Sequence, residues 1–439
     1  FVRLTADKYA APTGQPIAIS AEASAPRAGA TLLIDGKPHA SRVAGNRLTA
    51  SVVFDTAGEH RVELVHGDKR EIMILLAADD PDSLLRRRAE FLMDRKQVLE
   101  PGSSYDGAYP VLDLETGERV IDETFADHNA ARERLGSGVL IGLLAAQEPP
   151  GEWRNRLDES FRRFYAFLNR EIQDEQGVVH NTVGYAGKER LYNWPLALQA
   201  HLCAWDLTGD RQCLNRFMLA LRVYYAKGGD RFYAIGIPIE AGLQALQQAG
   251  MTTERTEALG LFRRHADAII ATGLDIPAHE VKYEQSIMGP ALQIVAETAV
   301  VTGEAKYKTA VETFLPLLEA FHGRQPHYRL HDIGIRHWDG YWFGKHKRYG
   351  DTMPHYWSTI SAEGFRLCAR LGHAAHAKRA RDILVANFAN YDSTGAGHCA
   401  YLYPRSINGL PGNYADPYDN DQDWALVNWI HFKRDRSSR

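Results

Sequence analysis

The first 78 residues alternate between apolar and polar positions in short segments. Apolar or β-branched runs recur about every ten residues, separated by turn residues: Ile17 to Ile19, 31–34, 48–54, 61–65 and 71–76. Such alternation is typical of strands that bury one face, and Asp35-Gly36 is a strong hairpin turn. The pattern predicts a small antiparallel β-sandwich over residues 1–78. Because this segment holds no cluster of titratable or stacking residues, we expect a packing or spacer module.

From residue 83 to the C-terminus the period changes to 3.6 residues. Asp82 or Ser83 suits the N-cap of the first helix, so the domain boundary falls just before it. The segments with helical periodicity are 83–98, 128–147, 154–173, 191–207, 211–227, 233–249, 254–272, 283–302, 305–321, 358–371, 375–390 and 421–434. Gly209 and Gly303 each separate two segments and suit a left-handed helix C-terminus. We predict an all-helical domain over residues 83–439, built from six hairpins.

Six helical hairpins can close into an (α/α)6 toroid or stack as an open superhelix. Several predicted helices open with a Tyr or Trp beside an amide or carboxylate, as at 192–194, 283–285 and 355–357. In a toroid these positions converge on one mouth. We therefore predict a mainly α fold, an (α/α)6-type toroid preceded by the β-sandwich.

Residues 322–357 fit neither period. They include six of the 18 histidines, and several glycines and a proline interrupt them. Long loops in compact domains are usually functional or disordered, and the aromatic content here favours order. We predict that this stretch forms one wall of an active site.

Composition and charge narrow the function classes. The 439 residues carry a formal net charge of −4 with a pI near 6.5, which provides no basic field for nucleic acid. No apolar run reaches the length of a membrane span. The four cysteines lie far apart without a metal or redox motif, so we expect buried thiols. We expect a periplasmic or secreted protein whose leader precedes this numbering, with a cytoplasmic protein as the alternative; the oligomeric state stays open.

Aromatic side chains beside amide, carboxylate and guanidinium groups suit a carbohydrate. Sugar rings offer apolar C–H faces to aromatic rings and hydroxyls to planar polar groups. With 20 Tyr and 8 Trp the chain has the material for such a site. The predicted substrate-binding residues are Tyr192, Asn193, Trp194, Glu240, Tyr283, Glu284, Gln285, Trp338, Asp339, Trp342, His346, Asp351, His355, Tyr403 and Arg405.

Cationic and phenolic groups outnumber carboxylates between residues 337 and 355, which favours an acidic oligo- or polysaccharide as substrate. β-Elimination at a uronic acid needs a group that neutralises the sugar carboxylate, a base that removes the C5 proton, and an acid that protonates the leaving oxygen. A guanidinium can hold both carboxylate oxygens. The predicted roles are His337 or Tyr349 as base, Tyr341 as acid, and Arg348 with Asn193 or Gln285 at the carboxylate.

Two other functions stay open. Hydrolysis of a glycosidic bond needs two carboxylic acids, for which the candidates are Glu240, Glu284, Asp339 and Asp351. A helical-repeat protein with an aromatic groove could instead bind glycans or peptides without turnover.

A metal site is a further alternative. The histidines at 327, 331 and 337 with a neighbouring Asp could ligate zinc or calcium, but the glutamate of an HExxH motif is missing. We therefore expect neither a metal nor a cofactor.

A small β-module followed by a helical toroid with aromatic, His- and Arg-rich loops resembles the toroidal polysaccharide lyases and the six-hairpin glycosidases. In the character of residues 336–357 (RHWDGYWFGKHKRYGDTMPHYW), the chain is most similar to lyases that cleave rhamnose–glucuronate linkages in plant arabinogalactan or bacterial exopolysaccharide. The resemblance implies a His or Tyr base, a Tyr acid, and an Arg, Asn or Gln at the carboxylate. It rests on architecture and carries no diagnostic motif.

Overall fold

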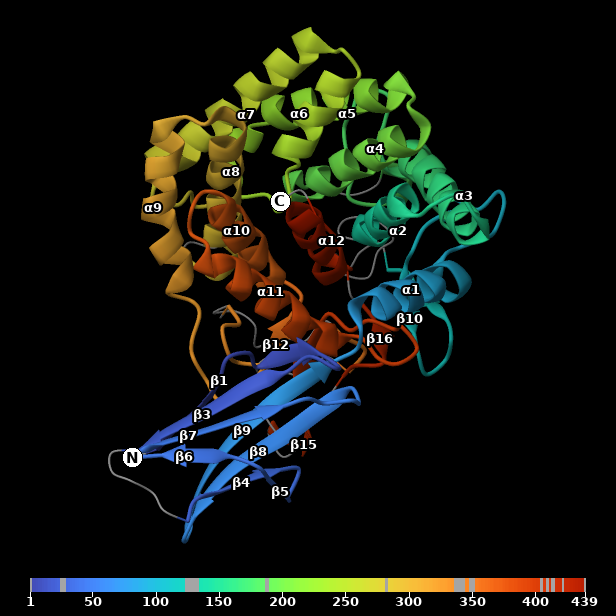
Figure 1. Cartoon of the computed structure of the whole chain (residues 1–439). Coiled ribbons are helices and arrows are strands. Elements are labelled where there is room, and N and C mark those ends of the chain that lie inside the picture. Colours follow the sequence, from blue (N-terminus) through green and yellow to red (C-terminus); the bar gives the residue numbers. More distant parts are fainter. Residues whose placement is uncertain are drawn as a thin grey trace.

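A computed structural model gives the arrangement of the chain. It describes residues 2–23, 29–122, 134–185, 189–280, 283–334, 344–346, 352–402, 406–407, 410–411, 415–420 and 422–437. Figure 1 shows a β-rich part at one side of a ring of helices. The predicted fold class, a helical toroid with a small antiparallel β-sandwich before it, is confirmed.

The strands between residues 2 and 78 form two sheets. The first has the order β1 (Val2–Ala6), β3 (Ile17–Ala23), β7 (Arg47–Val52) and β6 (Arg42–Ala44). The second has the order β2 (Ala10–Pro12), β9 (Lys69–Ala78), β8 (Gly58–His66), β4 (Thr31–Ile34) and β5 (Lys37–His39). All pairs are antiparallel except β2 with β9. Alternate residues such as Ile17 and Ile19 on β3 and Val62 and Leu64 on β8 are buried, so each sheet turns one face to a shared core.

The predicted hairpin turn at Asp35-Gly36 is confirmed. Ile34 pairs with Lys37 across a two-residue loop, and Asp35 and Gly36 have φ angles of 50° and 77°. Positive φ at both central positions matches the right-handed twist of the flanking strands.

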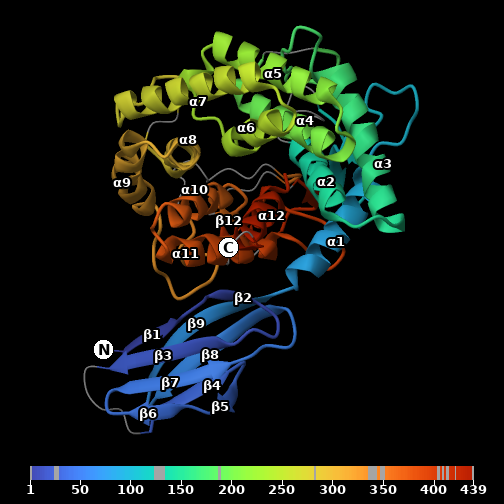
Figure 2. The same ribbon diagram turned by 45° about the horizontal axis from the view of Figure 1, so that its top comes forward.

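Alternate helices form the inner wall of the ring. They are α2 (Leu135–Gln147), α4 (Trp194–Thr208), α6 (Ile239–Gln248), α8 (Gln285–Thr302), α10 (Ser358–Arg370) and α12 (Trp424–Ser437). Each contacts the next, and α12 contacts α2 (Figures 1 and 2). This last contact closes the ring, so the chain is a toroid and not an open superhelix.

The remaining helices form the outer layer. They are α1 (Pro81–Phe91), α3 (Glu152–Phe167), α5 (Arg211–Ala226), α7 (Thr252–Thr272), α9 (Ala305–Glu319) and α11 (Ala375–Asn387). The outer helix α3 buries one stripe of side chains, whereas the inner helix α2 is buried nearly all round. Gly138 permits that burial, because a Cβ there would lie 2.2 Å from the Phe164 ring of α3.

The predicted N-cap of the first helix, Asp82 or Ser83, is wrong: Asp80 caps α1, and its carboxylate accepts from the Ser83 N–H at 2.9 Å, because Pro81 can begin a helix without an N–H of its own. The C-terminal residues Gly209 and Gly303 are left-handed, with φ of 65° and 70°, as predicted. The helix expected over 233–249 begins only at Ile239. The backbone before it cannot be helical, because Gly236 has a φ of 78° and Pro238 lacks the N–H that a helix interior needs.

Several short elements were not predicted, because strands of two to four residues leave no periodic signal. The strands are β10 (Val111–Asp113), β11 (Arg119–Val120), β12 (Thr352–His355), β13 (Ala400–Leu402), β14 (Ser406–Ile407), β15 (Leu410–Pro411) and β16 (Tyr418–Asp419). α1 and α3 continue as π-helical turns over Leu92–Lys96 and Leu168–Ile172. Single 3-10 turns cover Val183–Tyr185, Leu191–Asn193, Gly229–Arg231 and Phe388–Asn390.

The cysteines are free thiols, as expected: Cys203, Cys213, Cys368 and Cys399 are all buried. Within the described ranges, none of the helices combines the length and the apolar character required to cross a membrane.

The β-sandwich is attached to the chain just after α9. The backbone N–H of Ile74 on β9 donates to Pro326, and the N–H of Tyr328 donates back to Ile74, at 2.9 and 3.1 Å. Glu59 of β8 accepts from the Tyr328 hydroxyl at 2.7 Å and from the Arg329 guanidinium at 3.0 and 3.1 Å. The first part of the 322–357 stretch is therefore an interface with the β-sandwich.

Replacing Glu59 by alanine is expected to lower the free energy of unfolding by about 1 kcal/mol, since buried Tyr328 and Arg329 lose a shared acceptor. Chemical denaturation measures this loss. The matched control is Glu71→Ala on the exposed part of β9, which should change the stability by less than about 0.5 kcal/mol. Equal stabilities of the two variants would show that Glu59 contributes nothing to this attachment.

Candidate functional site

Ten predicted site residues lie outside the described residues, so their roles stay predictions: His337, Trp338, Asp339, Tyr341, Trp342, Arg348, Tyr349, Asp351, Tyr403 and Arg405. The backbone of His355 lies in β12. The described candidates cluster at the N-terminal ends of inner helices and in the lumen of the toroid.

At the start of α8, Gln285 is fully buried in a hydrogen-bonded network. Its Nε2 donates to the Trp357 carbonyl at 3.0 Å and to Ser361 Oγ at 2.9 Å. Both amide hydrogens are thus in use, and only Oε1 has no partner among the described residues. An acceptor oxygen cannot neutralise a sugar carboxylate, so the predicted role of Gln285 is not supported.

His322 completes this network. Its Nδ1 lies 2.7 Å from the Asp332 carbonyl, and its Nε2 lies 3.0 Å from Ser361 Oγ. A carbonyl only accepts, so Nδ1 carries the proton and Nε2 accepts from Ser361. Burial lowers the pKa of His322 to about 4, which keeps the imidazole neutral at neutral pH. His322 therefore links the segment after α9 to the start of α10, where Gln285 of α8 also bonds to Ser361.

At the start of α4, Asn193 is fully buried. Its Nδ2 donates to Asn181 Oδ1 at 3.1 Å, while Oδ1 has no partner among the described residues. The second Nδ2 hydrogen has no acceptor among the described residues, which leaves it for a ligand. Asn193 is therefore the better supported of the two amides predicted at the substrate carboxylate.

Glu280 is a buried carboxylate at the candidate site that the sequence analysis missed. It is 6% exposed and accepts hydrogen bonds from the Tyr192 hydroxyl and, at 3.1 Å, from the Tyr233 backbone N–H. Burial raises the pKa of Glu280, and burial also raises the pKa of Tyr233 to about 12. The sequence signal that could have identified Glu280 is a carboxylate in the Pro-Ala-His-Glu loop, shortly before the inner helix α8. Glu280 fixes the predicted Tyr192 hydroxyl in place.

Three other predicted substrate-binding residues, Trp194, Tyr283 and His346, contact other parts of the protein. Trp194 is completely buried, with its ring 6.4 Å from that of Tyr224, so it offers no face to a sugar. Tyr283 is 41% exposed, but its hydroxyl donates to the Leu317 carbonyl of α9 at 2.9 Å. His346 is exposed, and its backbone N–H donates to Asp416 at 3.1 Å. Trp194 is therefore not supported as a sugar-binding residue, whereas the roles of Tyr283 and His346 stay predictions.

The two described carboxylates proposed for hydrolysis, Glu240 and Glu284, have different surroundings. Glu284 is fully buried just before α8. Glu240 lies in the first turn of α6. The predicted helix began at residue 233, which would have placed Glu240 more than one turn into the helix. Its oxygens accept from both terminal nitrogens of Arg370, at 2.6 and 2.8 Å. Glu240 is therefore an ion-paired residue of the lumen.

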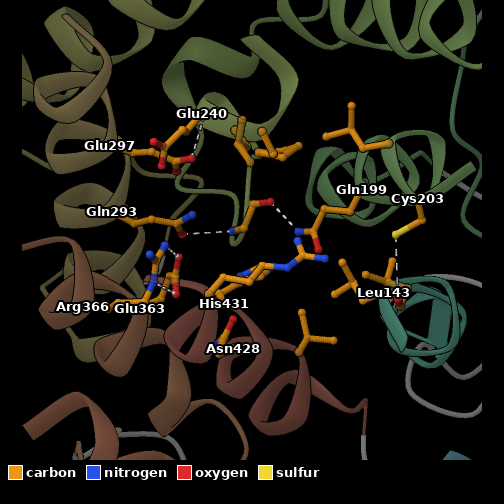
Figure 3. Close-up of a pocket in the computed structure, with 18 of the residues that line it drawn as sticks. Leu143, Gln199, Cys203, Glu240, Gln293, Glu297, Glu363, Arg366, Asn428 and His431 are labelled. Carbon is orange, nitrogen blue, oxygen red and sulfur yellow. Dashed lines mark hydrogen bonds and ion pairs between the residues drawn. The ribbon is translucent and has the colours of Figure 1, made fainter. Parts of the chain in front are cut away.

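The lumen contains a cavity of about 880 Å³ lined by all six inner helices. Figure 3 shows side chains from opposite sides of the ring facing one another across it. The segment before α6 spans part of the lumen: Gln199 of α4 donates to the Gly236 carbonyl at 2.6 Å, and the Gly236 N–H donates to Gln293 of α8 at 3.2 Å. These amides position the wall of the cavity.

Charged groups in the cavity are neutralised by one another. Glu363 accepts from Arg366 at 2.9 and 2.5 Å, and Asp435 accepts from the remaining terminal nitrogen of Arg366. Glu297 instead accepts a hydrogen bond from the backbone N–H of Glu240, at 2.8 Å. Burial raises the pKa of Glu297 to about 8, so it is a neutral carboxylic acid at pH 7.

Glu297→Gln tests this protonation. With a folded pKa near 8 and an ordinary unfolded value, the folded state binds the extra proton, so the wild type loses stability as the pH rises through that interval. Glutamine cannot ionise, and the variant should gain roughly 3 kcal/mol relative to the wild type between pH 5 and pH 8. Urea denaturation at both pH values measures the difference. A stability difference that does not change with pH would contradict a neutral Glu297.

Comparisons with known proteins identify the toroid. No protein-family model and no curated protein matches the chain. Among solved structures, the chain is similar to the Polysaccharide Lyase BACCELL_00875, with a TM-score of 0.92 and 33% identity over 99% of this chain. The chain spans 64% of the length of that lyase.

Two glycoside hydrolases share the fold. They are a family 76 enzyme from a bovine Bacteroides thetaiotaomicron strain and the GH76 α-mannanase BT2949 of Bacteroides thetaiotaomicron, with TM-scores of 0.51 and 0.52. Both are 10% identical; the first match covers 99% of each chain, and the second covers 82% of this chain and 97% of the mannanase. The expected likeness to toroidal polysaccharide lyases and glycosidases is confirmed, although the hydrolase matches concern the fold alone.

Proposed function

We propose that the protein is a polysaccharide lyase that cleaves a uronic-acid-containing glycan by β-elimination. The observation that carries this proposal is the likeness to a polysaccharide lyase, which extends over nearly the whole chain. A rhamnose–glucuronate linkage is the proposed bond, and a periplasmic or secreted location would give access to such a polymer.

In the proposed reaction, Arg348 and the spare Asn193 hydrogen neutralise the uronate carboxylate and so acidify the C5 proton. His337 or Tyr349 removes that proton, and its electrons form the C4–C5 double bond as the C4–O bond breaks. Tyr341 donates a proton to the leaving oxygen. Glu280, through its bond to Tyr192, supports the neighbouring α4 start where Asn193 lies.

Hydrolysis is the weaker alternative. It needs one protonated and one ionised carboxyl group that both reach the substrate. Of the described candidates, Glu240 is held by Arg370 and Glu284 is fully buried. Glu284, which is no more buried than Asn193, stays open for that reaction together with Asp339 and Asp351.

The test is to incubate the protein with a panel of uronic-acid glycans and to follow both the ultraviolet absorbance of a 4,5-unsaturated uronate and the number of new reducing ends. Elimination produces both signals together. New reducing ends without the absorbance would overturn the lyase in favour of a hydrolase, and binding of glycans without either signal would favour the non-catalytic alternative.

A further inference from the structure

The lumen cavity extends from the segment before α6 toward the C-terminal ends of the other inner helices. The exposed residues that line it include Gln147, Asp206, Lys433 and Arg434, near the C-terminal ends of α2, α4 and α12, and Ala241 and Gln244 on the short helix α6. Asn193 and Gln285 instead mark the first turns of α4 and α8. A 14-residue helix such as α12 is about 20 Å long, so the two ends of the lumen are well separated.

An aromatic layer closes the cavity toward the helix starts. Trp424 and Ile235 line the cavity and pack in one cluster with Tyr356 and Trp357. The Trp424 ring is stacked with Trp357 at 6.3 Å and meets Tyr356 edge-on at 5.1 Å. Tyr356 and Trp357 come directly before α10, so this layer lies between the helix starts and the lumen.

The inner part of the cavity presents neutral polar groups. Gln199 and Gln293 come from facing helices, and Asn428 and His431 come from α12. Gln199 Oε1 is buried without a partner among the described residues. Burial lowers the pKa of His431 to about 4, so its imidazole is neutral, as is the Glu297 carboxyl. Leu143, Leu196 and Val427 supply apolar surface between these groups.

The charged side chains that line the cavity interact with one another or with other protein residues, so they do not require a charged ligand. Arg366 and Arg370 are paired with Glu363, Glu240 and Asp435. Lys433 is paired with Asp82 at 2.5 Å. The two remaining charged residues of the lining, Asp206 and Arg434, act on one another: burial raises the pKa of Asp206, and the Arg434 charge opposes that shift. An ionic ligand would have to displace one of these partners, whereas a neutral ligand leaves every pair intact.

We propose that this cavity binds a neutral mono- or disaccharide at a site separate from the cleavage site. Side-chain amides, an imidazole and a carboxylic acid can donate to and accept from sugar hydroxyls, and the apolar side chains and Trp424 can contact the C–H faces of the ring. A cavity of about 880 Å³ falls in the range that holds small ligands. The proposal does not rest on the lyase activity.

Isothermal titration of the full chain with D-glucose, D-galactose, D-mannose, L-rhamnose, cellobiose and lactose tests the proposal, with D-glucuronate as the charged probe. At least one neutral sugar should bind with a one-to-one stoichiometry. Ala241→Trp places a bulky ring at the exposed entrance on α6, and Val427→Phe fills the cavity from α12. Each should weaken binding by at least about tenfold.

The matched control is Gln247→Trp, an exposed position of α6 that does not line the cavity. It should bind the sugar like the wild type. Absence of binding for every neutral sugar, preference for glucuronate, or equal binding by the Ala241→Trp, Val427→Phe and control proteins would each overturn the proposal. Circular dichroism checks folding, and the two blocking variants act from different helices. The absorbance assay for cleavage does not depend on sugar binding in the cavity, so the lyase proposal and the cavity proposal can fail separately.

Discussion

Replacement of Arg88 by methionine is expected to lower the free energy of unfolding by about 3–5 kcal/mol, because it leaves buried carboxylates without their partner. Arg88 of α1 is wholly buried. Its Nε donates to Asp423 at 2.6 Å, and its Nη1 donates to Asp419 at 2.7 Å. Equilibrium denaturation in urea measures the loss.

The neighbours of the two carboxylates cannot replace the guanidinium. Lys96 contacts Asp419 at 2.7 Å, and Ser137 of α2 donates to Asp423 at 2.6 Å. Arg88 holds the pKa of the Asp419 carboxyl well below its usual range, against the effect of burial. The cluster joins α1, α2 and the segment before α12, where the ring closes, so its loss should affect the whole toroid.

The control for this variant is Arg162→Met on the outer helix α3. Arg162 is 60% exposed and pairs with Asp158 in the preceding turn. Exposed pairs of this kind contribute about 0–1 kcal/mol, so the control should unfold almost like the wild type. Similar stability losses for both arginine variants would mean that the buried cluster does not hold the ring together.

The largest effects on activity are expected for His337→Ala and Tyr349→Phe. If one of them is the base, its variant should lower kcat by about 10²–10⁴ with little change in KM, because general acid–base groups act on the transition state. The initial rate of absorbance increase on a glucuronate-containing glycan measures this. Loss with only one of the two variants identifies the base.

His39→Ala and Tyr307→Phe serve as matched controls. His39 lies in the exposed strand β5, and Tyr307 lies in the outer helix α9, both away from the starts of the inner helices. Both controls should keep the wild-type rate. Full activity in His337→Ala and Tyr349→Phe together would remove the 337–349 segment from the proposed chemistry and leave Asn193, Tyr192 and Glu280 as the residues to replace.

Local signals in the sequence were sufficient for the long helices, for the main strands of the β-sandwich and for the class of fold. The periods of two and 3.6 residues reflect which face each strand or helix buries, and Asp35-Gly36, Gly209 and Gly303 occupy turns that few other residues tolerate. These preferences act within a few residues, so they can be read without a structure. The start of α6 was misplaced because Gly236 and Pro238 interrupt an otherwise helical pattern.

The partners of the polar residues were decided only by the tertiary structure. Arg88 meets Asp423 across 335 residues, and Glu240 meets Arg370 across 130. Both amide hydrogens of Gln285 are bonded to Trp357 and Ser361, so neither is left for a substrate carboxylate. Closure of the ring brings these groups together. Burial then determines which of them are ionised, and their hydrogen bonds determine which donors remain for a ligand. The sequence determined which helices and strands form, whereas long-range packing determined which of their polar groups are left to bind a ligand.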